Sequence, residues 1–238
     1  MNTESSVSME SNFLGLAGAD ANHEQLPMSP ASIFRALSDA ELEELGSSVS
    51  VRRARRHELV FCEGEPLSHL YLVQSGSFKL VRHSRDGQAL IVTLVAAGGC
   101  FGSMAEPLVS ATRAQALEDS VCLLVSLNAV RHILNRNAAF ALALLTDAEA
   151  RRRKTEERAA QLAFEAVSQR VARLLLDTSD QHSGELVFPL TQTEIANLIG
   201  SRRETVCSIL NRFRRDNLVS IRRGRIRIRD RQSLSCIK

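Results

Sequence analysis

The pattern of apolar and polar positions changes from helical to strand-like and back to helical along the chain. Residues 32–47 carry apolar side chains at helical spacing, and Ser38 with Glu41 has the spacing of a capping box that starts a second short helix. From about 50 to 127, short runs rich in β-branched residues alternate with turn signals such as Ser75-Gly76. This spacing predicts a small antiparallel barrel or roll, with strands at 58–62, 70–74, 77–82, 89–95 and 122–126.

A single long helix is expected over residues 139–164. Apolar and small side chains recur there at nearly the spacing of a coiled-coil seam. A helix of this length with so narrow an apolar stripe needs a partner to be stable, although a lone surface helix is the alternative. The residues expected at a dimer interface are Phe140, Leu144, Ala148, Arg152, Thr155, Ala159 and Leu162.

The most specific pattern lies between residues 190 and 217, where two helices are expected around a tight turn. Thr191 can cap the first helix, because Glu194 follows three residues later in the spacing of a capping box. Gly200 supplies the turn, since a positive φ costs glycine little. The second helix, over residues 202–215, has an apolar stripe formed by Val206, Ile209, Leu210 and Phe213. A helix at 165–180 and a short strand at 184–190 are expected before this pair.

The opposite side of the second helix carries polar side chains that suit the major groove of DNA. Arginine there can bind guanine O6 and N7, and glutamate can accept a hydrogen bond from cytosine N4. Residues 218–230 then predict a hairpin that turns near Gly224 and whose outward side chains are placed to meet phosphates. By the period-2 rule, its inward residues are Ile226 and Ile228, and its outward residues are Arg225, Arg227 and Arg229.

The distribution of charge agrees with a nucleic-acid partner. Residues 191–238 contain 12 Lys/Arg and 4 Asp/Glu, a net charge of +8, which leaves −5 for the rest of a chain whose total is +3. A basic segment on a mildly acidic body is typical of a modular nucleic-acid binder, and a solvated basic face is the alternative. With no Trp and 4% aromatic residues, a base-stacking platform for single strands is not expected.

Other functional classes find little support in the sequence. The five cysteines are scattered, without a CxxC pair or a Cys/His cluster at zinc spacing, so we expect a reducing compartment, no metal and no cofactor. No apolar run is long enough to cross a membrane, and the polar N-terminus is unlike a signal peptide, so a cytoplasmic protein is expected. No phosphate-binding loop, nucleophile elbow or HExxH motif suggests an enzyme.

Several of these segments resemble one known family. Residues 61–80 look like the start of a cyclic-nucleotide-binding-type roll, and 162–176 resemble the hinge and first DNA-domain helix of the bacterial Crp/Fnr regulators. Residues 195–206 are similar to that family's helix-turn-helix signature. The resemblance covers about residues 32–235. Because the chain lacks the cysteines of an iron–sulfur cluster, it is most similar in character to FixK-type members. The resemblance implies an α+β fold with a jelly-roll-like sensor domain at 30–138, a dimerisation helix at 139–164 and a winged helix-turn-helix at 165–238. Residues 1–29 are rich in Ser, Asn, Glu, Gly and Ala and lack sustained periodicity, so they are expected to form a flexible tail.

The resemblance also assigns roles on the DNA face. Arg203 and Glu204 match the family's base-reading pair, and Cys207 and Ser208 lie on the same side. Ser208 departs from the pattern, because many relatives carry arginine there. The residues at or near phosphate-contacting positions are Thr191, Thr193, Arg202, Thr205 and Arg225. The expected partners are a second copy of the chain, a palindromic double-stranded operator with half-sites about one helical turn apart, and RNA polymerase. Both activation and repression remain open.

The effector is the least determined part. Gly102-Ser103 stands where cyclic-AMP binders have Gly-Glu, Arg113 is displaced from the position of the phosphate-binding arginine, and Thr155 is followed by Glu156. We therefore expect a vestigial effector site and DNA binding that does not depend on cyclic AMP. A cyclic nucleotide or haem sensor that switches DNA binding is the alternative.

Cys207 has two interpretations. It is either a small half-buried residue or an oxidation-sensitive thiol that the helix N-terminus, Arg202 and Arg203 hold toward the thiolate form.

Overall fold

The computed structural model describes residues 33–104, 109–222 and 225–237 of the chain, which divide into two compact units. The first contains the described residues up to Arg82 together with Thr93–Arg153, and the second contains His83–Val92 together with the residues from Lys154 onward. Among the described residues, no helix is both long enough and apolar enough to cross a membrane.

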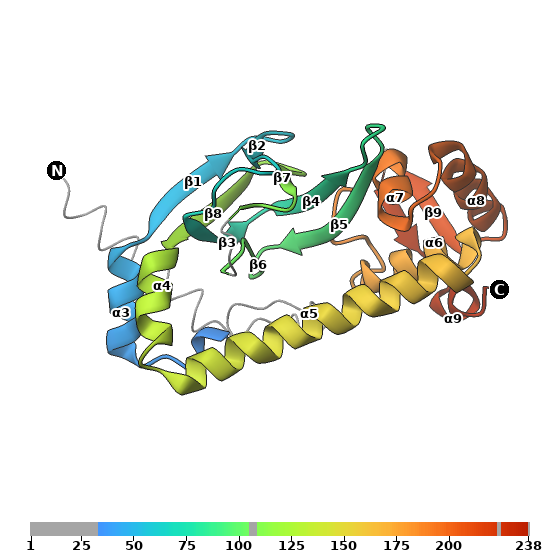
Figure 1. The fold of residues 1–238 in the computed structure, drawn as a ribbon. Helices are drawn as coiled ribbons and strands as arrows, with labels where there is room; N and C mark the ends of the chain where they lie inside the picture. Colours follow the sequence, from blue (N-terminus) through green and yellow to red (C-terminus); the bar gives the residue numbers. More distant parts are fainter. Residues whose placement is uncertain (1–32, 105–108, 223–224, 238) are drawn as a thin grey trace. The chain divides into compact units, whose positions relative to one another are not determined.

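The predicted antiparallel roll is confirmed as two four-stranded sheets (Figure 1). One sheet has the order β1-β8-β3-β6, formed by Ser50–Ala54, Ser120–Ser126, His69–Ser75 and Cys100–Phe101. The other has the order β2-β7-β4-β5, formed by Leu59–Phe61, Arg113–Ala116, Ser77–His83 and Ala89–Ala96. Strands β1, β6 and β7 were not predicted. Arg113-Ala-Gln-Ala has a weak strand propensity, and it becomes a strand because β2 and β4 pair with it on both sides.

Aromatic side chains from both sheets form the centre of the roll. Phe101 of β6 stacks on Tyr71 of β3, with ring centroids 5.0 Å apart and planes 4° apart. Phe78 of β4 meets the same ring at 5.1 Å, and Phe61 of β2 meets Tyr71 at 5.3 Å. Since Phe61 and Phe78 belong to one sheet and Tyr71 and Phe101 to the other, these contacts hold the two sheets face to face.

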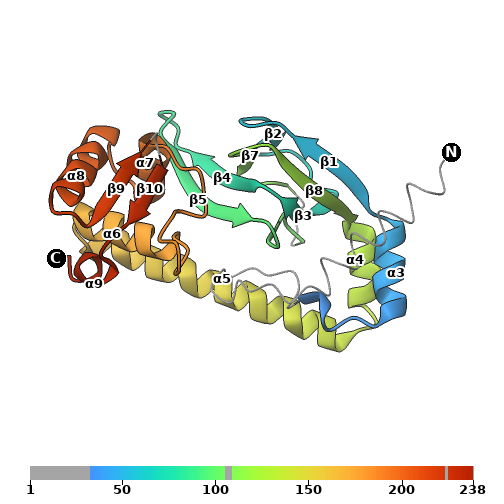
Figure 2. The ribbon, with the colours of Figure 1, turned by 180° about the vertical axis from the view of Figure 1, so that it is seen from behind.

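Two short helices lie side by side at one end of the roll (Figures 1 and 2). Helix α3 spans Asp39–Ser47 and α4 spans Leu127–Leu134. The predicted capping box is present at the start of α3, because the Glu41 carboxylate accepts from both the backbone N–H and the hydroxyl of Ser38, each at 2.9 Å. The long helix α5 covers Ala138–Phe164, one residue more than expected.

The second unit contains the predicted helix-turn-helix and wing (Figure 2). Its elements are α6 (Val167–Asp177), α7 (Gln192–Ile199), α8 (Arg203–Arg215), β9 (Val219–Arg222), β10 (Arg225–Ile228) and α9 (Arg231–Ser235). The strand expected at 184–190 is wrong. That segment makes only isolated bridges, from Glu185 to Arg227 and from Leu186 to Ser179, because no strand edge pairs with it along its length. The predicted helix at 165–180 is shorter at both ends, because α6 begins after its N-cap at Ala166 and ends at Asp177, before its C-cap at Thr178.

Candidate nucleic-acid interface

Helix α7 begins with the capping box that the sequence predicted. The Thr191 hydroxyl accepts from the Glu194 backbone N–H at 3.2 Å and donates to the Glu194 carboxylate at 2.8 Å. The same carboxylate accepts from the Thr191 backbone N–H at 2.8 Å. Both halves of the capping box are therefore formed, and they fix the first turn of α7. The Glu194 carboxylate is only 6% exposed, and these hydrogen bonds replace the water that it loses.

The turn between α7 and α8 depends on Gly200. Its φ of 61° and ψ of 49° lie in the left-handed region, which glycine adopts without the penalty of a Cβ. The backbone N–H groups of Gly200 and Ser201 both donate to the Ala196 carbonyl oxygen. The chain thus reverses within a few residues and begins α8 at Arg203, with Arg202 at the N-cap.

Helix α8 separates an apolar face from a polar one, as predicted. Val206, Leu210 and Phe213 are completely buried, while Ile209, the fourth residue of the expected stripe, is half-buried. Because this stripe packs against its own unit, the opposite face of the helix is left to solvent.

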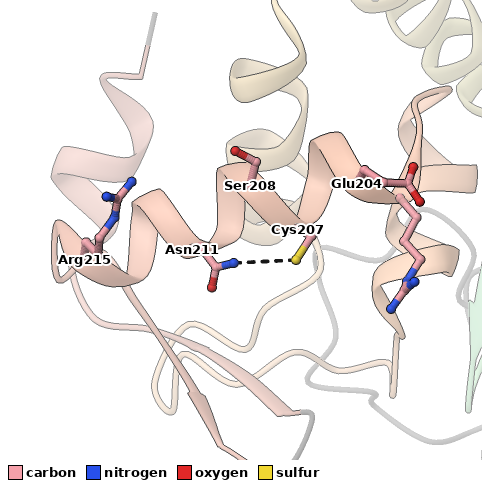
Figure 3. A pocket seen from close by; sticks show the side chains of 6 residues that line it. Glu204, Cys207, Ser208, Asn211 and Arg215 are labelled. Atoms are coloured by element: carbon pink, nitrogen blue, oxygen red, sulfur yellow. Dashed lines mark hydrogen bonds between the residues drawn. The ribbon is translucent and has the colours of Figure 1, made fainter.

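The exposed side of α8 forms an open hollow of about 460 Å³ (Figure 3). The hollow is lined by Arg203, Glu204, Cys207, Ser208, Asn211 and Arg215. Positions 203, 207, 211 and 215 follow one another at intervals of four, so they share one helical stripe. All four predicted base-reading residues are brought together here. Asn211 and Arg215 also line the hollow, and neither is among the residues predicted to read bases.

Cys207 is half-buried in this hollow, and the Asn211 amide Nδ2 donates to its Sγ at 3.5 Å (Figure 3). Glu204 and Ser208 are exposed on either side along the helix. The thiol therefore lies among groups that can read DNA bases.

The residues predicted to meet phosphates are exposed, but they differ in their hydrogen bonds. Thr193, Arg202, Thr205 and Arg225 are exposed. Thr191 is also exposed, yet its hydroxyl hydrogen is given to Glu194.

The wing has its predicted alternation, with Ile226 and Ile228 buried and Arg225, Arg227 and Arg229 exposed. Arg227 donates to the Ser183 carbonyl oxygen at 2.7 Å and Arg229 to Asn217 Oδ1 at 3.1 Å. These two arginines therefore also brace the unit itself. The expected turn at Gly224 lies outside the described residues.

The proposed effector residues lie in different surroundings. Gly102, Ser103 and Arg113 are half-buried in the first unit, and the Arg113 Nε is a buried donor without a partner among the described residues. Thr155 is exposed on α5 and belongs to the second unit.

Cys100, two residues before Gly102, is fully buried. Arg151 donates to its Sγ at 3.4 Å while also pairing with Asp147. Burial raises the pKa of the Cys100 thiol, and Arg151 only partly opposes this. The thiol is therefore held in its neutral form. Within the described residues, no group of three or more His, Cys, Asp or Glu side chains is arranged to hold a metal ion.

The expected dimer stripe on α5 does not lie on a single exposed face. Phe140 is 1% exposed and stacks on Phe34 with centroids 6.1 Å apart, and Leu144 packs against the core of the roll. The other five residues of the stripe are exposed. Leu142 and Leu145, which the stripe omitted, are 63% and 59% exposed.

Comparisons with known proteins agree with this architecture. Residues 51–137 match the family described as cyclic nucleotide-binding domain, and residues 169–237 match the Crp-like helix-turn-helix domain. The CRP-like cAMP-activated global transcriptional regulator of Mycobacterium tuberculosis is 28% identical over 216 residues, which cover 87% of this chain and 96% of that protein. The cyclic AMP receptor protein of Thermus thermophilus is 28% identical over 205 residues, covering 85% and 94%. The structure of FixK2 from Bradyrhizobium japonicum has a similar fold, with a TM-score of 0.73 at 22% identity, covering 78% of this chain and 95% of FixK2.

A roll of the cyclic-nucleotide-binding type followed by a winged helix-turn-helix defines a DNA-binding transcription regulator. The two domains together are those of a Crp/Fnr-type regulator.

Proposed function

We propose that this regulator acts as a homodimer that reads a palindromic operator through the exposed face of α8, without requiring cyclic AMP, and that oxidation of Cys207 weakens its binding. The observation that carries the proposal is the stripe of polar side chains on the side of α8 opposite the buried Val206, Leu210 and Phe213. A helix with one polar and one buried apolar face can enter the major groove while its apolar face stays packed against the rest of the domain. RNA polymerase is the expected further partner.

Base reading is assigned to Arg203 and Glu204. Selection from a library of random duplexes with the native protein identifies the operator, and the variants are then measured on its single-base derivatives. Arg203→Ala or Glu204→Ala is expected to lose about 1–3 kcal/mol of discrimination at one base pair in each half-site. Arg53→Ala, which removes an exposed arginine of β1, is the control for charge. Unchanged discrimination in both α8 variants would contradict the assignment, and failure to select any sequence would contradict the proposed function.

Dimerisation is assigned to the exposed side of α5. Leu142 and Leu145 are large apolar side chains in contact with solvent there, and such a helix face is stabilised by a partner. The proposed interface comprises these two leucines with Ala148, Arg152, Thr155, Ala159 and Leu162. In sedimentation velocity, Leu145→Glu is expected to yield monomers, whereas Ala150→Glu, an exposed position on another side of the helix, keeps the native mass. A Leu145→Glu variant with the native mass would exclude this face.

Redox control is assigned to Cys207. Peroxide transfers one oxygen atom to the thiolate, giving sulfenate and water. The oxidised group adds bulk and polarity between Glu204 and Ser208, where a base edge would approach. Operator affinity of the native protein and of Cys236→Ser, which removes an exposed cysteine, is expected to fall after peroxide treatment, while Cys207→Ser is insensitive. Equal loss in Cys207→Ser and the native protein would refute the assignment.

A second candidate is a small-molecule sensor whose ligand, a cyclic nucleotide or haem, switches DNA binding. The family match over 51–137 and the names of the cAMP-activated relatives favour a nucleotide. The absence of a carboxylate at Gly102-Ser103 argues against a ribose contact of the usual kind. Calorimetric titration with cyclic AMP, together with operator binding measured with and without it, tests the nucleotide form of this candidate: no heat of binding and an unchanged operator Kd are expected under the first proposal.

A further inference from the structure

Two arginines from outside the helix-turn-helix occupy the carbonyl end of α7. Arg158 Nη2 of α5 donates to the Leu198 carbonyl oxygen, and Arg170 Nη1 of α6 donates to the Ile199 carbonyl oxygen. These are the last two residues of α7, whose carbonyls have no partner inside the helix. The two guanidinium groups therefore supply hydrogen bonds and positive charge where the helix dipole is negative.

The Arg158 guanidinium makes two further hydrogen bonds beside the one to Leu198. Its Nη2 also donates to the Ile91 carbonyl oxygen at 2.7 Å, and its Nη1 donates to the Val92 carbonyl oxygen at 2.8 Å. All three acceptor residues belong to the same compact unit as Arg158. Burial disfavours the charged guanidinium and lowers the pKa of Arg158, whereas the carbonyl oxygens that accept its hydrogen bonds favour the charged form. A planar fork of donors suits such a site better than a single ammonium group.

Apolar packing reaches the same turn. A Cβ placed on Gly200 would lie 3.1 Å from Leu162 Cδ2, and 3.9 Å from Arg170 Nη1. The last turns of α5 and the first turn of α6 therefore contact residues 198–200. Only Ser201 and Arg202 separate this segment from the start of α8 at Arg203. A shift of this turn would therefore also move the start of α8, where the base-reading stripe begins.

We infer that Arg158 and Arg170 are positioning residues for DNA recognition, which fix the turn after α7 and thereby the orientation of α8. They do not lie on the exposed stripe of α8 and need not touch DNA. This inference rests on the proposed reading of an operator by α8.

The test uses the full chain and two DNA probes: the duplex that the native protein selects from a random library, and a shuffled duplex of the same composition. Loss of one charge-assisted hydrogen bond changes an equilibrium between conformations by about tenfold, and the apparent Kd follows the competent fraction. Arg158→Gln is therefore expected to weaken binding to the selected duplex about tenfold, while binding to the shuffled duplex stays near that of the charge control Arg53→Gln. Arg170→Gln is expected to act in the same direction.

Arg158→Lys distinguishes positioning from folding. It keeps the charge without the fork, and it is expected to recover part of the specificity while its melting temperature stays near the native value. A loss that is equal on both duplexes, or no loss on either, would overturn the inference.

A separate arm does not depend on the operator. Hydrogen exchange of the amides at 200–202 is expected to be faster in Arg158→Gln than in Arg53→Gln. Unchanged exchange would overturn the inference even if the native protein selected no duplex, an outcome that would itself refute the proposed function.

Discussion

The capping box of α7 yields a prediction whose size can be worked out bond by bond. Thr191→Ala leaves the backbone N–H that donates to Glu194, but it removes both bonds of the hydroxyl. Loss of an N-cap acceptor costs about 1 kcal/mol. The second bond is donated to a carboxylate that is only 6% exposed and that still accepts from the Thr191 backbone N–H, so its loss costs about another 1 kcal/mol. The expected destabilisation is about 2 kcal/mol, or roughly a 30-fold rise in the opening constant of α7.

Native-state hydrogen exchange of amides in Gln192–Ile199 measures this quantity in the full-length protein. Thr191→Ser keeps the hydroxyl and is expected to change the opening free energy by less than about 0.5 kcal/mol. Thr193→Ala, two residues further along and exposed, is expected to be equally mild, because surface substitutions lie within about 0.5 kcal/mol. The reasoning fails if these amides exchange as slowly in Thr191→Ala as they do in Thr193→Ala.

Three further outcomes are expected. Gly184→Ala would place a Cβ 2.7 Å from the Ile228 carbonyl oxygen at a φ of 67°, so it should destabilise the second unit by more than about 2 kcal/mol, visible as a lower melting temperature. Hydrogen bonds from the Ser38 backbone and side chain, in that order, lower the pKa of Glu41 below 4.5. The stability that these bonds contribute is complete above pH 4.5 and is lost as the pH falls through the lower folded value, so Glu41→Gln should flatten the acid side of the unfolding profile. Arg225→Ala should weaken binding to all duplexes alike and reduce the slope of log K against log salt by about 1; an unchanged slope would remove Arg225 from the phosphate contacts.

Local signals in the sequence were sufficient for the helix-turn-helix of the second unit. Helix ends are marked by hydrogen bonds and dihedral preferences that act within a few residues, as at Thr191 with Glu194 and at Gly200. The stripe of α8 follows from a period of 3.6, which every helix obeys. The strand expected at 184–190 failed because a β-rich run becomes a strand only when a neighbouring edge accepts it.

The sequence by itself determined the roll, the long helix, the winged helix-turn-helix and the side of α8 that is offered to DNA. Periodicity, caps and turns each depend on residues that are only a few positions apart in the chain. Only the tertiary structure decided which residues of α5 are exposed. Phe140 and Leu142 are equally apolar in the pattern, yet the first is buried on Phe34 and the second is 63% exposed. It also decided that the Arg158 guanidinium donates to the Leu198 carbonyl oxygen. That contact joins residues forty positions apart, and no local pattern indicates which of many arginines will find a buried acceptor.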